Sequence, residues 1–578
     1  MRKYIMLIHN IIIVSFIFNI LTNVTNIHKL TSKLPNCANC VGTHPKVCIE
    51  GFEKTMNLRF PRLLISDNKQ LAVKCLCHAV VLAYILAAIH HWYLSDVKDI
   101  GWKNGLGLLI VLATCYYGVL PVKYMFTLIH AGKLVKLLPL EHFKIGVLCT
   151  FLGSFVLFIF FDTKNNRHRL VPLAGLGVFV LVGFIFSKHR GHVNWTTVAS
   201  GLATQITIGM LTIRWQVGRS IVQAVGELAE KFFSFAYVGA KVTYGNELID
   251  NYGVFAFKVL SVLFFMCFVI EILFYYGIIQ TIVIKLGWCL QKLLGTTAAE
   301  SVNTCASVFL GMSEAPIIIK PYLPDLTESE IHAVMMGGFS TVAGTVFAAY
   351  TSFGIDPAYL ITASVMSAPT ALSFSKLIFP ETEKSMNSVD QICTKKTTDE
   401  GNVMDAACKG AQFGLKIIGA IVANIVAFVS FVAFINAIIS WLGHLVGLDD
   451  LTFEYVLGKI LIPVTWLLGV DPSECEAVGK LIGLKMTINE FVAYKQMGDL
   501  IKEGKLNRKS EIVATFALCS FANPGSIGSM IATLTTLCPT QRSAITKNVF
   551  RAFLGGTVTC FLTAAIASLL MPDEGLKD

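Results

Sequence analysis

The chain has 578 residues, of which 54% are hydrophobic and only 15% are charged. Soluble proteins usually carry about 25% charged residues, so this composition excludes a soluble protein, and the many apolar residues also exclude a disordered one. The formal net charge of +10 fits basic loops beside a lipid bilayer better than nucleic-acid binding, because no basic run is long enough to follow a phosphate backbone. The composition therefore predicts a polytopic, all-α membrane protein.

The N-terminal region, residues 1–71, begins with an apolar segment at residues 4–21 that follows two basic residues. Such a segment is typical of a signal or an anchor, but no small-residue cleavage site follows it clearly. Cys37, Cys40 and Cys48 lie in the polar stretch behind it. Their irregular spacing favours a loop thiol or a disulfide over a zinc site, which stays open as the alternative.

Apolar runs long enough to cross about 30 Å of hydrocarbon follow along the chain. In an N-terminal transmembrane region, residues 72–213, we expect spans near residues 72–94, 105–129, 143–161, 170–187 and 197–213. The next region, residues 214–296, opens with a segment of mixed charged and apolar residues that extends to residue 252. This mixture predicts helices lying along the membrane surface, followed by a scaffold span at residues 254–279.

The rest of the chain divides into a first repeat (297–380), a polar loop with scaffold spans (381–470) and a second repeat with the C-terminus (471–578). Further spans are expected near residues 338–352, 357–374, 414–442, 453–468, 512–535 and 549–570. The polar stretch 381–409 is too short to build a core of its own.

Two apolar segments, residues 297–323 and 471–497, are interrupted, and each carries one acid near its middle, Glu314 and Glu490. The first opens with the capping box Thr297-Ala-Ala-Glu300, and the second opens with Asp471-Pro472, an acid cap with proline at the first helical position. Both patterns predict that a helix starts there and runs to the buried acid.

After each acid, a polar loop leads to the same string, Ser-Glu-Ile-x-Ala, at residues 329–333 and 510–514. Each following helix runs into small and polar residues, 337–341 and 520–526, which should break it. Non-helical backbone at membrane depth must line a cavity or be buried in protein, and half-helix ends hold substrate and ion in secondary transporters. The pattern predicts a secondary transporter with inverted repeats; the alternative is a chance repeat whose glycines only let helices pack.

Several longer motifs surround these positions. They are Gly311-Met312-Ser313-Glu314-Ala315-Pro316, Lys320-Pro321-Tyr322-Leu323, Ser329-Glu330-Ile331-His332-Ala333-Val334-Met335, Ser364-Val365-Met366-Ser367-Ala368-Pro369, Asn489-Glu490-Phe491-Val492-Ala493-Tyr494 and Ala517-Leu518-Cys519-Ser520-Phe521-Ala522-Asn523. In this order they resemble the motifs of the concentrative nucleoside transporters, from about residue 253 to residue 570.

The resemblance implies sodium- or proton-coupled import of nucleosides, without enzymatic activity and without a cofactor other than the coupling ion. It also implies two re-entrant hairpins, near residues 297–323 and 471–497. A homotrimer is expected, in which a scaffold holds three protomers and a transport unit of each one moves. The expected location is the plasma membrane.

The resemblance places the ribose at Glu490, with Asn523 and Ser526 completing a polar ring. A carboxylate accepts hydrogen bonds only, and therefore suits the vicinal hydroxyls of a ribose. The alternative role for Glu490 is a buried structural acid paired with Lys485 or Lys495.

The nucleobase would face Met312, Ser313 and Glu314, with apolar surface from Phe521 and Val346. The alternatives are a helix-capping role for Glu314 and plain core packing for the two apolar residues. Many members of the family carry Gln where this chain has Met312. Gly311-Met312 resembles the purine-preferring subtype of the family, which implies purine nucleosides plus uridine as cargo. Physically, Met cannot hydrogen-bond a pyrimidine edge but packs against a larger purine.

The implied ion ligands are the hydroxyls of Ser307, Ser313 and Thr341 and the backbone carbonyls of Leu310 and Val342. Ser307 replaces the usual Asn and Leu310 the usual Val, as in bacterial proton-coupled relatives. Sodium is the favoured coupling ion. If the Ser307 hydroxyl cannot reach it, the alternative is a proton carried by Glu314 or Glu490.

Two other classes compete with a coupled transporter. A membrane-embedded enzyme would need paired acids for a metal, or a His/Asp pair close in sequence, and neither lies near Glu314 or Glu490. A receptor or channel would not need the broken, repeated segments. An equilibrative carrier of the same fold remains an alternative interpretation.

Overall fold

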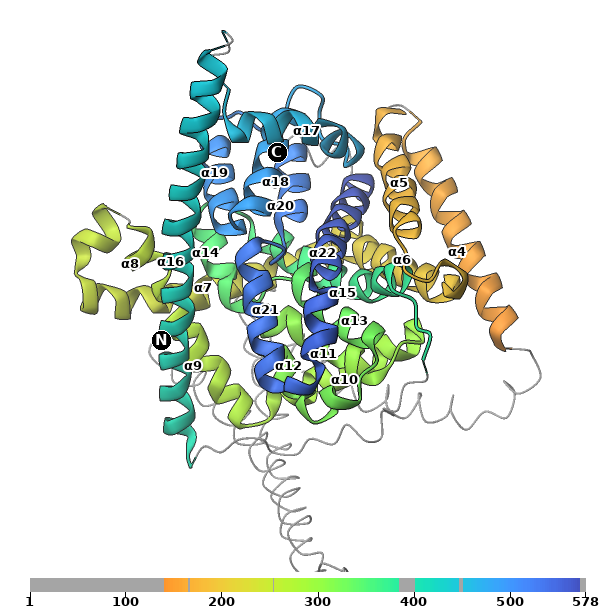
Figure 1. Cartoon of the computed structure of the whole chain (residues 1–578), viewed down its shortest axis with the longest axis horizontal. Helices are drawn as coiled ribbons and strands as arrows, with labels where there is room; N and C mark the ends of the chain where they lie inside the picture. Colours follow the sequence, from red (N-terminus) through yellow and green to blue (C-terminus); the bar gives the residue numbers. More distant parts are fainter. Residues whose placement is uncertain are drawn as a thin grey trace, which may run out of the picture. The chain divides into compact units, whose positions relative to one another are not determined.

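The computed structural model describes residues 140–164, 167–252, 254–383, 401–445, 447 and 451–571. Every regular element in these residues is a helix, so the predicted all-α class is confirmed for the described part of the chain (Figure 1). Several predicted features lie outside the described residues: region 1–71 with Cys37, Cys40 and Cys48, and the spans at 72–94 and 105–129.

Six segments among the described residues are long and apolar enough to cross a membrane. They are Ile145–Asp162, Arg167–Ile185, Trp195–Arg214, Ala256–Tyr275, Val403–His444 and Pro539–Leu570. Each one overlaps a span predicted from the sequence. The expected multi-pass membrane protein is therefore confirmed.

The first described helices are α4 (Leu140–Asp162), α5 (Val171–Ile185) and α6 (Trp195–Gly209). Helix α6 continues into the π-helical turn η4 (Met210–Arg214), and α7 (Gln216–Tyr244) follows η4. The side chains of Val217, Ile221, Val225 and Leu228 form an exposed apolar stripe on α7. Their spacing of three or four residues places them on one face of the helix. The expected amphipathic helix is present, and its position along a membrane surface stays a prediction.

The chain then forms α8 (Phe255–Lys258), α9 (Ser261–Tyr275), α10 (Ile278–Leu294), α11 (Ala298–Phe309) and α12 (Ala315–Ile318). The predicted capping box is present at the start of α11, where the backbone N–H of Thr297 donates to Glu300 at 2.7 Å. A second capping box, Thr327 with Glu330, starts α13 (Glu328–Ser340). Helix α14 (Gly344–Ser352) follows α13, and α15 (Pro357–Ile378) follows α14.

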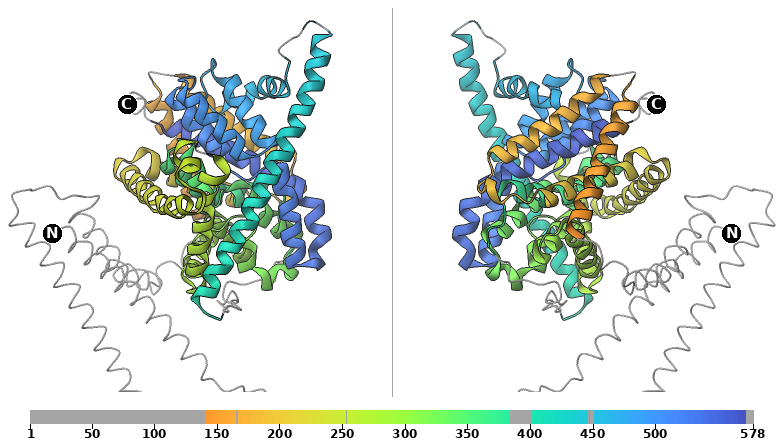
Figure 2. Two further views of the ribbon diagram at one scale, coloured as in Figure 1. Left: turned by 90° about the vertical axis from the view of Figure 1, so that its left-hand side faces the viewer. Right: turned by 90° about the vertical axis from the view of Figure 1, so that its right-hand side faces the viewer.

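The long helix α16 (Val403–His444) includes the predicted span 414–442 and packs along α9 (Figures 1 and 2). After it come α17 (Phe453–Leu467), α18 (Cys475–Thr487), α19 (Glu490–Lys502), α20 (Arg508–Leu518), α21 (Pro524–Leu537) and α22 (Arg542–Leu570). The helix start predicted at Asp471 is wrong, because α18 begins at Cys475. The Asp471 carboxylate instead accepts a hydrogen bond from the Asn507 side chain, ahead of α20.

Two of the predicted spans, 338–352 and 512–535, are not continuous helices. Helix α13 ends at Ser340, and residues 341–343, here called the first break, are extended before α14. Helix α20 ends at Leu518, and residues 519–523, the second break, precede α21. The second break overlaps the predicted stretch 520–526, whereas the first begins only at the last residue of the predicted stretch 337–341, because α13 continues through its two glycines to Ser340.

Helix α22 lies at the centre of the described helices. Within its apolar stretch, 89% of the residues are buried by protein, compared with 11% for α4 and 6% for α16. It packs against α13, α15, α20 and α21 (Figure 1). Helices α4 and α16 therefore offer their apolar side chains to the surroundings, whereas α22 is enclosed by the two broken helices.

Candidate functional site

A cavity of about 410 Å³ lies between the two interrupted regions and α16. This volume falls in the range of ligand pockets, roughly 300–1,000 Å³. All eight side chains predicted to contact a substrate line it: Met312, Ser313, Glu314, Val346, Glu490, Phe521, Asn523 and Ser526. The structure thus brings together, in one cavity, residues that are far apart in the sequence.

Glu490 begins α19 and is almost completely buried. Its carboxylate accepts a hydrogen bond from Asn523 Nδ2 at 2.8 Å and a longer one from the Tyr350 hydroxyl at 3.4 Å. The side-chain oxygen Oδ1 of Asn523 accepts a hydrogen bond from the backbone N–H of Ser526 at 2.9 Å and so caps α21. One side chain therefore joins the second break to the acid and fixes the direction of its carboxylate.

The structure does not support the alternative of a direct ion pair for Glu490. The Lys485 ammonium donates to the backbone carbonyl of Ala517 at 3.1 Å, and Lys495 is exposed while Glu490 is buried. The carboxylate oxygens instead meet neutral donors. Such an arrangement leaves acceptor capacity for further hydroxyl groups, because an ionised carboxylate has about four lone-pair positions.

Glu314 reaches the same cavity from the tip that joins α11 to α12. The tip turns at Gly311, whose φ of +95° favours glycine. A Cβ at this position would lie 2.9 Å from the Ala343 Cβ and 3.1 Å from a carboxylate oxygen of Glu314. Glu314 makes no side-chain capping bond to α12, so the helix-capping alternative is not supported.

A second glycine lets this tip lie close to α13. A Cβ added to Gly338 would be 2.9 Å from the Met312 Cβ, closer than side-chain carbons approach in folded proteins. Met312 is therefore held between α13 and the cavity, and the shape of this wall depends on Gly338.

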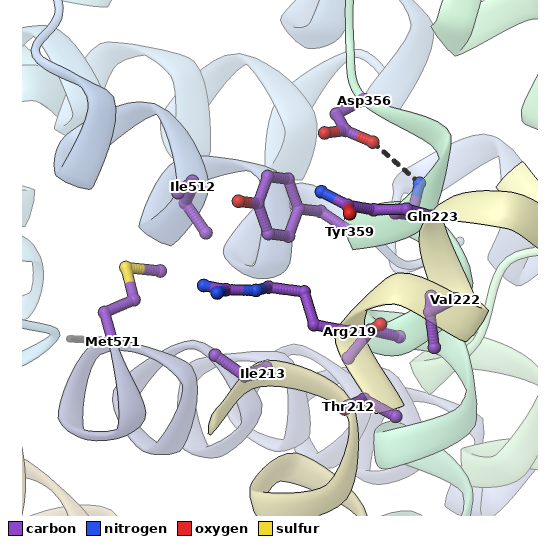
Figure 3. Close-up of a pocket in the computed structure, with 11 residues that line it drawn as sticks. Thr212, Ile213, Arg219, Val222, Gln223, Asp356, Tyr359, Ile512 and Met571 are labelled. Atoms are coloured by element: carbon purple, nitrogen blue, oxygen red, sulfur yellow. Dashed lines mark hydrogen bonds between the residues drawn. The ribbon is translucent and has the colours of Figure 1, made fainter. Parts of the chain in front are cut away.

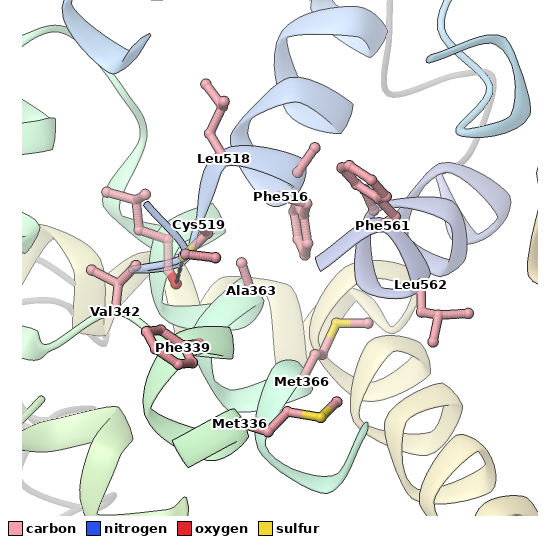
Figure 4. Close-up of a cluster of buried hydrophobic side chains, with 14 of the residues drawn as sticks. Met336, Phe339, Val342, Ala363, Met366, Phe516, Leu518, Cys519, Phe561 and Leu562 are labelled. Atoms are coloured by element: carbon pink, nitrogen blue, oxygen red, sulfur yellow. Dashed lines mark hydrogen bonds between the residues drawn. The ribbon is translucent and has the colours of Figure 1, made fainter. Parts of the chain in front are cut away.

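The two breaks meet inside the bundle of described helices. The backbone N–H of Phe521 donates to the carbonyl of Thr341 at 3.3 Å. The Cys560 thiol of α22 lies within 3.7 Å of the Ser340 carbonyl and 3.5 Å of the Cys519 carbonyl. Figure 4 shows Val342 of the first break in one buried cluster with Leu518 and Cys519. Carbonyls freed from helical bonding are therefore paired inside protein, as backbone at membrane depth requires.

The five predicted ion ligands lie beside the first break. Ser307, Leu310, Thr341 and Val342 are buried, and Ser313 lines the cavity. The Ser307 hydroxyl donates to the Asn303 carbonyl at 3.0 Å and the Thr341 hydroxyl donates to the Gly337 carbonyl at 2.9 Å. Because each hydroxyl donates a hydrogen bond to a helix carbonyl, its oxygen lone pairs remain available to coordinate a cation. The donor set is oxygen only, which suits a hard monovalent ion.

The sequence analysis missed one buried partner of Glu490 and one part of the cavity wall. The partner is Tyr350, which donates to Glu490; nothing in the local sequence indicated it, because an aromatic residue in an apolar run is typical of core packing. The missed part of the wall is one face of α16, with Phe413, Lys416, Ile417, Ala420 and Ile421. The helical spacing of these residues, with a lysine inside an apolar span, is the signal that could have indicated them.

A second, smaller cavity of about 40 Å³ lies between η4, α7, α15 and α20 (Figure 3). Arg219 points into it, past the Tyr359 ring and towards Met571. It shares no residue with the larger cavity. The neighbouring Arg214 pairs with Asp162 within the chain.

Interrupted helices that place two acids over one cavity, within a bundle of membrane spans, define a helical secondary transporter. Three family models match the chain. They are the Na+ dependent nucleoside transporter N-terminus over residues 174–247, a gate described as nucleoside recognition over residues 256–356, and the Na+ dependent nucleoside transporter C-terminus over residues 359–568.

The chain is 36% identical to sodium/nucleoside cotransporter 2 of Rattus norvegicus over 528 residues, which cover 88% of this chain and 78% of the relative. It is 39% identical to sodium/nucleoside cotransporter 1 of Oryctolagus cuniculus, over 74% of this chain and 66% of the relative. A solved structure of CNTnw in an inward-facing substrate-bound state is 35% identical, with a TM-score of 0.66, over 71% of this chain and 98% of that one.

The chain belongs to the concentrative nucleoside transporter family. The predicted family is therefore confirmed, as is the prediction of a transporter rather than an enzyme. Sodium is the coupling ion of this family, in agreement with the ion favoured from the sequence.

Proposed function

We propose that this chain is a secondary-active importer that couples the sodium gradient to nucleoside uptake. The observation that carries the proposal is the single cavity in which Glu314 and Glu490, from the two interrupted regions, face the same space. A solute held there contacts both regions at once. Its binding therefore couples the two halves of the moving unit.

In this proposal Glu490 accepts hydrogen bonds from the ribose hydroxyls, supported by Asn523 and Ser526. The bond from Asn523 at 2.8 Å aims the carboxylate into the cavity. Met312, Ser313 and Glu314 face the nucleobase, and Phe521 and Val346 supply apolar surface. The cargo is purine nucleosides plus uridine. Met312 offers a soft surface to the larger purines where a hydrogen-bonding Gln would favour pyrimidines, and uridine, itself a pyrimidine nucleoside, is included because Gly311-Met312 resembles the purine-preferring subtype of the family.

The sodium site consists of Ser307, Ser313 and Thr341 with the carbonyls of Leu310 and Val342. Its burial beside the first break supports this assignment. A sodium ion there would order the tip that carries Glu314, so that the nucleoside binds after the ion. The alternative is a proton-coupled or equilibrative carrier of the same fold.

At the level of the chain, residues 297–380 and 471–578 are two inverted transport repeats with re-entrant hairpins near 297–323 and 471–497. They move against scaffold parts within residues 214–296 and 381–470, while residues 72–213 add further spans and residues 1–71 precede them. The functional form is a homotrimer in the plasma membrane, surrounded by lipid. Exposed apolar side chains on α4, α7 and α16 support both a lipid and a protomer contact.

Uptake of labelled adenosine, uridine and thymidine tests the proposal, measured in sodium, in choline and across a pH step. We expect sodium-dependent uptake of adenosine and uridine, with little thymidine. The absence of uptake of any nucleoside would reject the function. Equal uptake in choline would favour the equilibrative alternative, and uptake driven only by the pH step would favour proton coupling.

A further inference from the structure

The α16 wall of the cavity carries a cation, Lys416, that the proposed binding scheme does not use. Among the described residues that line the cavity, it is the only one with a positive charge. Its ammonium makes no hydrogen bond or ion pair with another described residue, whereas Lys409 on the same helix pairs with Asp405 at 3.3 Å. An ionisable residue within a membrane span is costly, so an unpaired lysine there indicates a function.

Packing against α9 determines which face of α16 meets the cavity. A Cβ added to Gly410 would lie 2.5 Å from the Cys267 carbonyl oxygen, and a Cβ added to Gly414 would lie 3.3 Å from the Phe264 Cα. The two glycines therefore let α16 lie close to α9 at successive turns. The face that includes Lys416 lines the cavity, and α16 cannot rotate this lysine away from the cavity without losing the close contact with α9.

The cavity thus combines a charged donor with charged acceptors. The Lys416 ammonium has three N–H donors and no acceptor, whereas the Glu314 carboxylate only accepts. A nucleobase that lies between the tip with Glu314 and the α16 wall can satisfy both groups if it carries an acceptor beside a donor. The hydrogen-bonding edges of the nucleobases differ in this respect.

Uridine carries a ring N–H beside the carbonyl oxygen O4, and inosine and guanosine carry a ring N–H beside the carbonyl oxygen O6. We call this carbonyl with its neighbouring N–H the amide edge. Adenosine has no carbonyl, since its amino group N6 is a donor and lies beside a ring nitrogen that accepts. Only the amide edge offers a carbonyl oxygen to a lysine and an N–H to a carboxylate.

We infer that Lys416 is a specificity-determining residue, which donates a hydrogen bond to the carbonyl of the amide edge while Glu314 accepts from the neighbouring N–H. The inference rests on the proposed function, because Glu314 is the acid assigned to the nucleobase. It gives the proposed cargo a shared chemistry, since uridine, inosine and guanosine all carry the amide edge. Adenosine remains a substrate through its ribose and its ring surface, but it binds more weakly than inosine.

The charged donor can be removed with little change in the length of the side chain. Lys416→Met keeps an unbranched side chain but removes the charge and the donors, whereas Lys416→Arg keeps a charged donor. Lys409→Met is the matched control, because Lys409 lies seven residues (416 − 409 = 7), about two helical turns, before Lys416 and does not line the cavity. For each variant, the KM and maximal rate of inosine, uridine and adenosine uptake are measured in sodium, with membrane abundance in parallel.

We expect the wild type to show a KM for inosine about tenfold lower than its KM for adenosine, the order that one hydrogen bond to a charged group supplies. In Lys416→Met, the KM for inosine and uridine should rise about tenfold, while the KM for adenosine stays at the wild-type value. Lys416→Arg should keep the preference for inosine, and Lys409→Met should match the wild type for all three nucleosides.

Equal KM values of the wild type for inosine and adenosine would overturn the inference. This comparison needs no substituted protein, so it decides the inference even if the methionine variant does not accumulate in the membrane. A Lys416→Met variant that changes the three KM values equally, or not at all, would also overturn it, since the ammonium would then extend to the membrane surface or serve packing. Failure of the proposed function is a separate result, in which the wild type transports none of the three nucleosides.

Discussion

At the residue scale, the cavity depends on the small number of bonds that orient Glu490. Asn523 donates to one carboxylate oxygen and Tyr350 to the other, so the acid is held without a direct cationic partner. The position of the Glu490 carboxylate and the conformation of the second break therefore depend on each other. A change at either end should alter substrate affinity before it alters folding.

Replacing Glu490 with Gln should abolish nucleoside uptake. The amide would turn an N–H group towards the Asn523 donor or towards the ribose hydroxyls, and loss of bonds to a charged acceptor costs at least about tenfold in affinity for each bond. Uptake and membrane abundance are measured together. Glu503→Gln, at the exposed end of α19, is the control. Normal uptake by Glu490→Gln would remove the ribose assignment.

Replacing Met312 with Gln should shift selectivity towards pyrimidine nucleosides. Met312 lies in the cavity wall against Gly338, and Gln adds a donor and an acceptor with little change of volume. We expect the ratio of thymidine to adenosine uptake to rise about tenfold, the order that one polar contact supplies. An unchanged ratio in competition assays would contradict the purine preference proposed for Met312.

At the element scale, the sequence predicted the two broken helices but not the elements that pack against them. Glycine, serine and proline near residues 337–341 and 520–526 indicated both breaks, because local composition decides whether a helix continues. The sequence showed that α16 has a face of helically spaced residues with a lysine in it, but not that this face closes the cavity, since contact between α16 and the interrupted regions depends on packing across the chain. Tyr350 was missed for the same reason.

The Cys560 thiol connects the two breaks, and its removal should destabilise the protein. It has no exposed surface and lies beside the carbonyls of Ser340 and Cys519. Cys560→Val leaves these carbonyls without that donor, at a cost of about 1–3 kcal/mol, whereas Cys560→Ser keeps a donor. The melting temperature of the purified protein should fall more for the valine variant. An equal fall for both variants would show that packing volume, and not the hydrogen bonds, matters.

At the scale of the whole molecule, burial separates an enclosed centre from helices that face outward. The sequence predicted where the outer spans lie, because their apolar runs are continuous. It did not indicate that α22, which is also apolar enough to span a membrane, is enclosed by protein. Hydropathy alone does not distinguish a helix that faces lipid from a helix that faces other helices.

The exposed apolar faces lead to a prediction about assembly. Helices α7 and α16 carry large exposed apolar side chains, among them Leu228, Phe434 and Trp441. In a homotrimer, part of this surface contacts the neighbouring protomers. Light scattering in mild detergent should give three copies of the 63.3 kDa chain after subtraction of the detergent, and a monomer mass would contradict the trimer.

The central claim is that one cavity, with an acid from each interrupted region, couples sodium to nucleoside movement. Purified protein in liposomes tests it most directly, by the uridine concentration reached inside under an inward sodium gradient. The account predicts accumulation above the external concentration, which collapses when the sodium gradient is dissipated and is absent for Glu490→Gln. Uptake that stops at equal concentrations on both sides, with or without sodium, would contradict it.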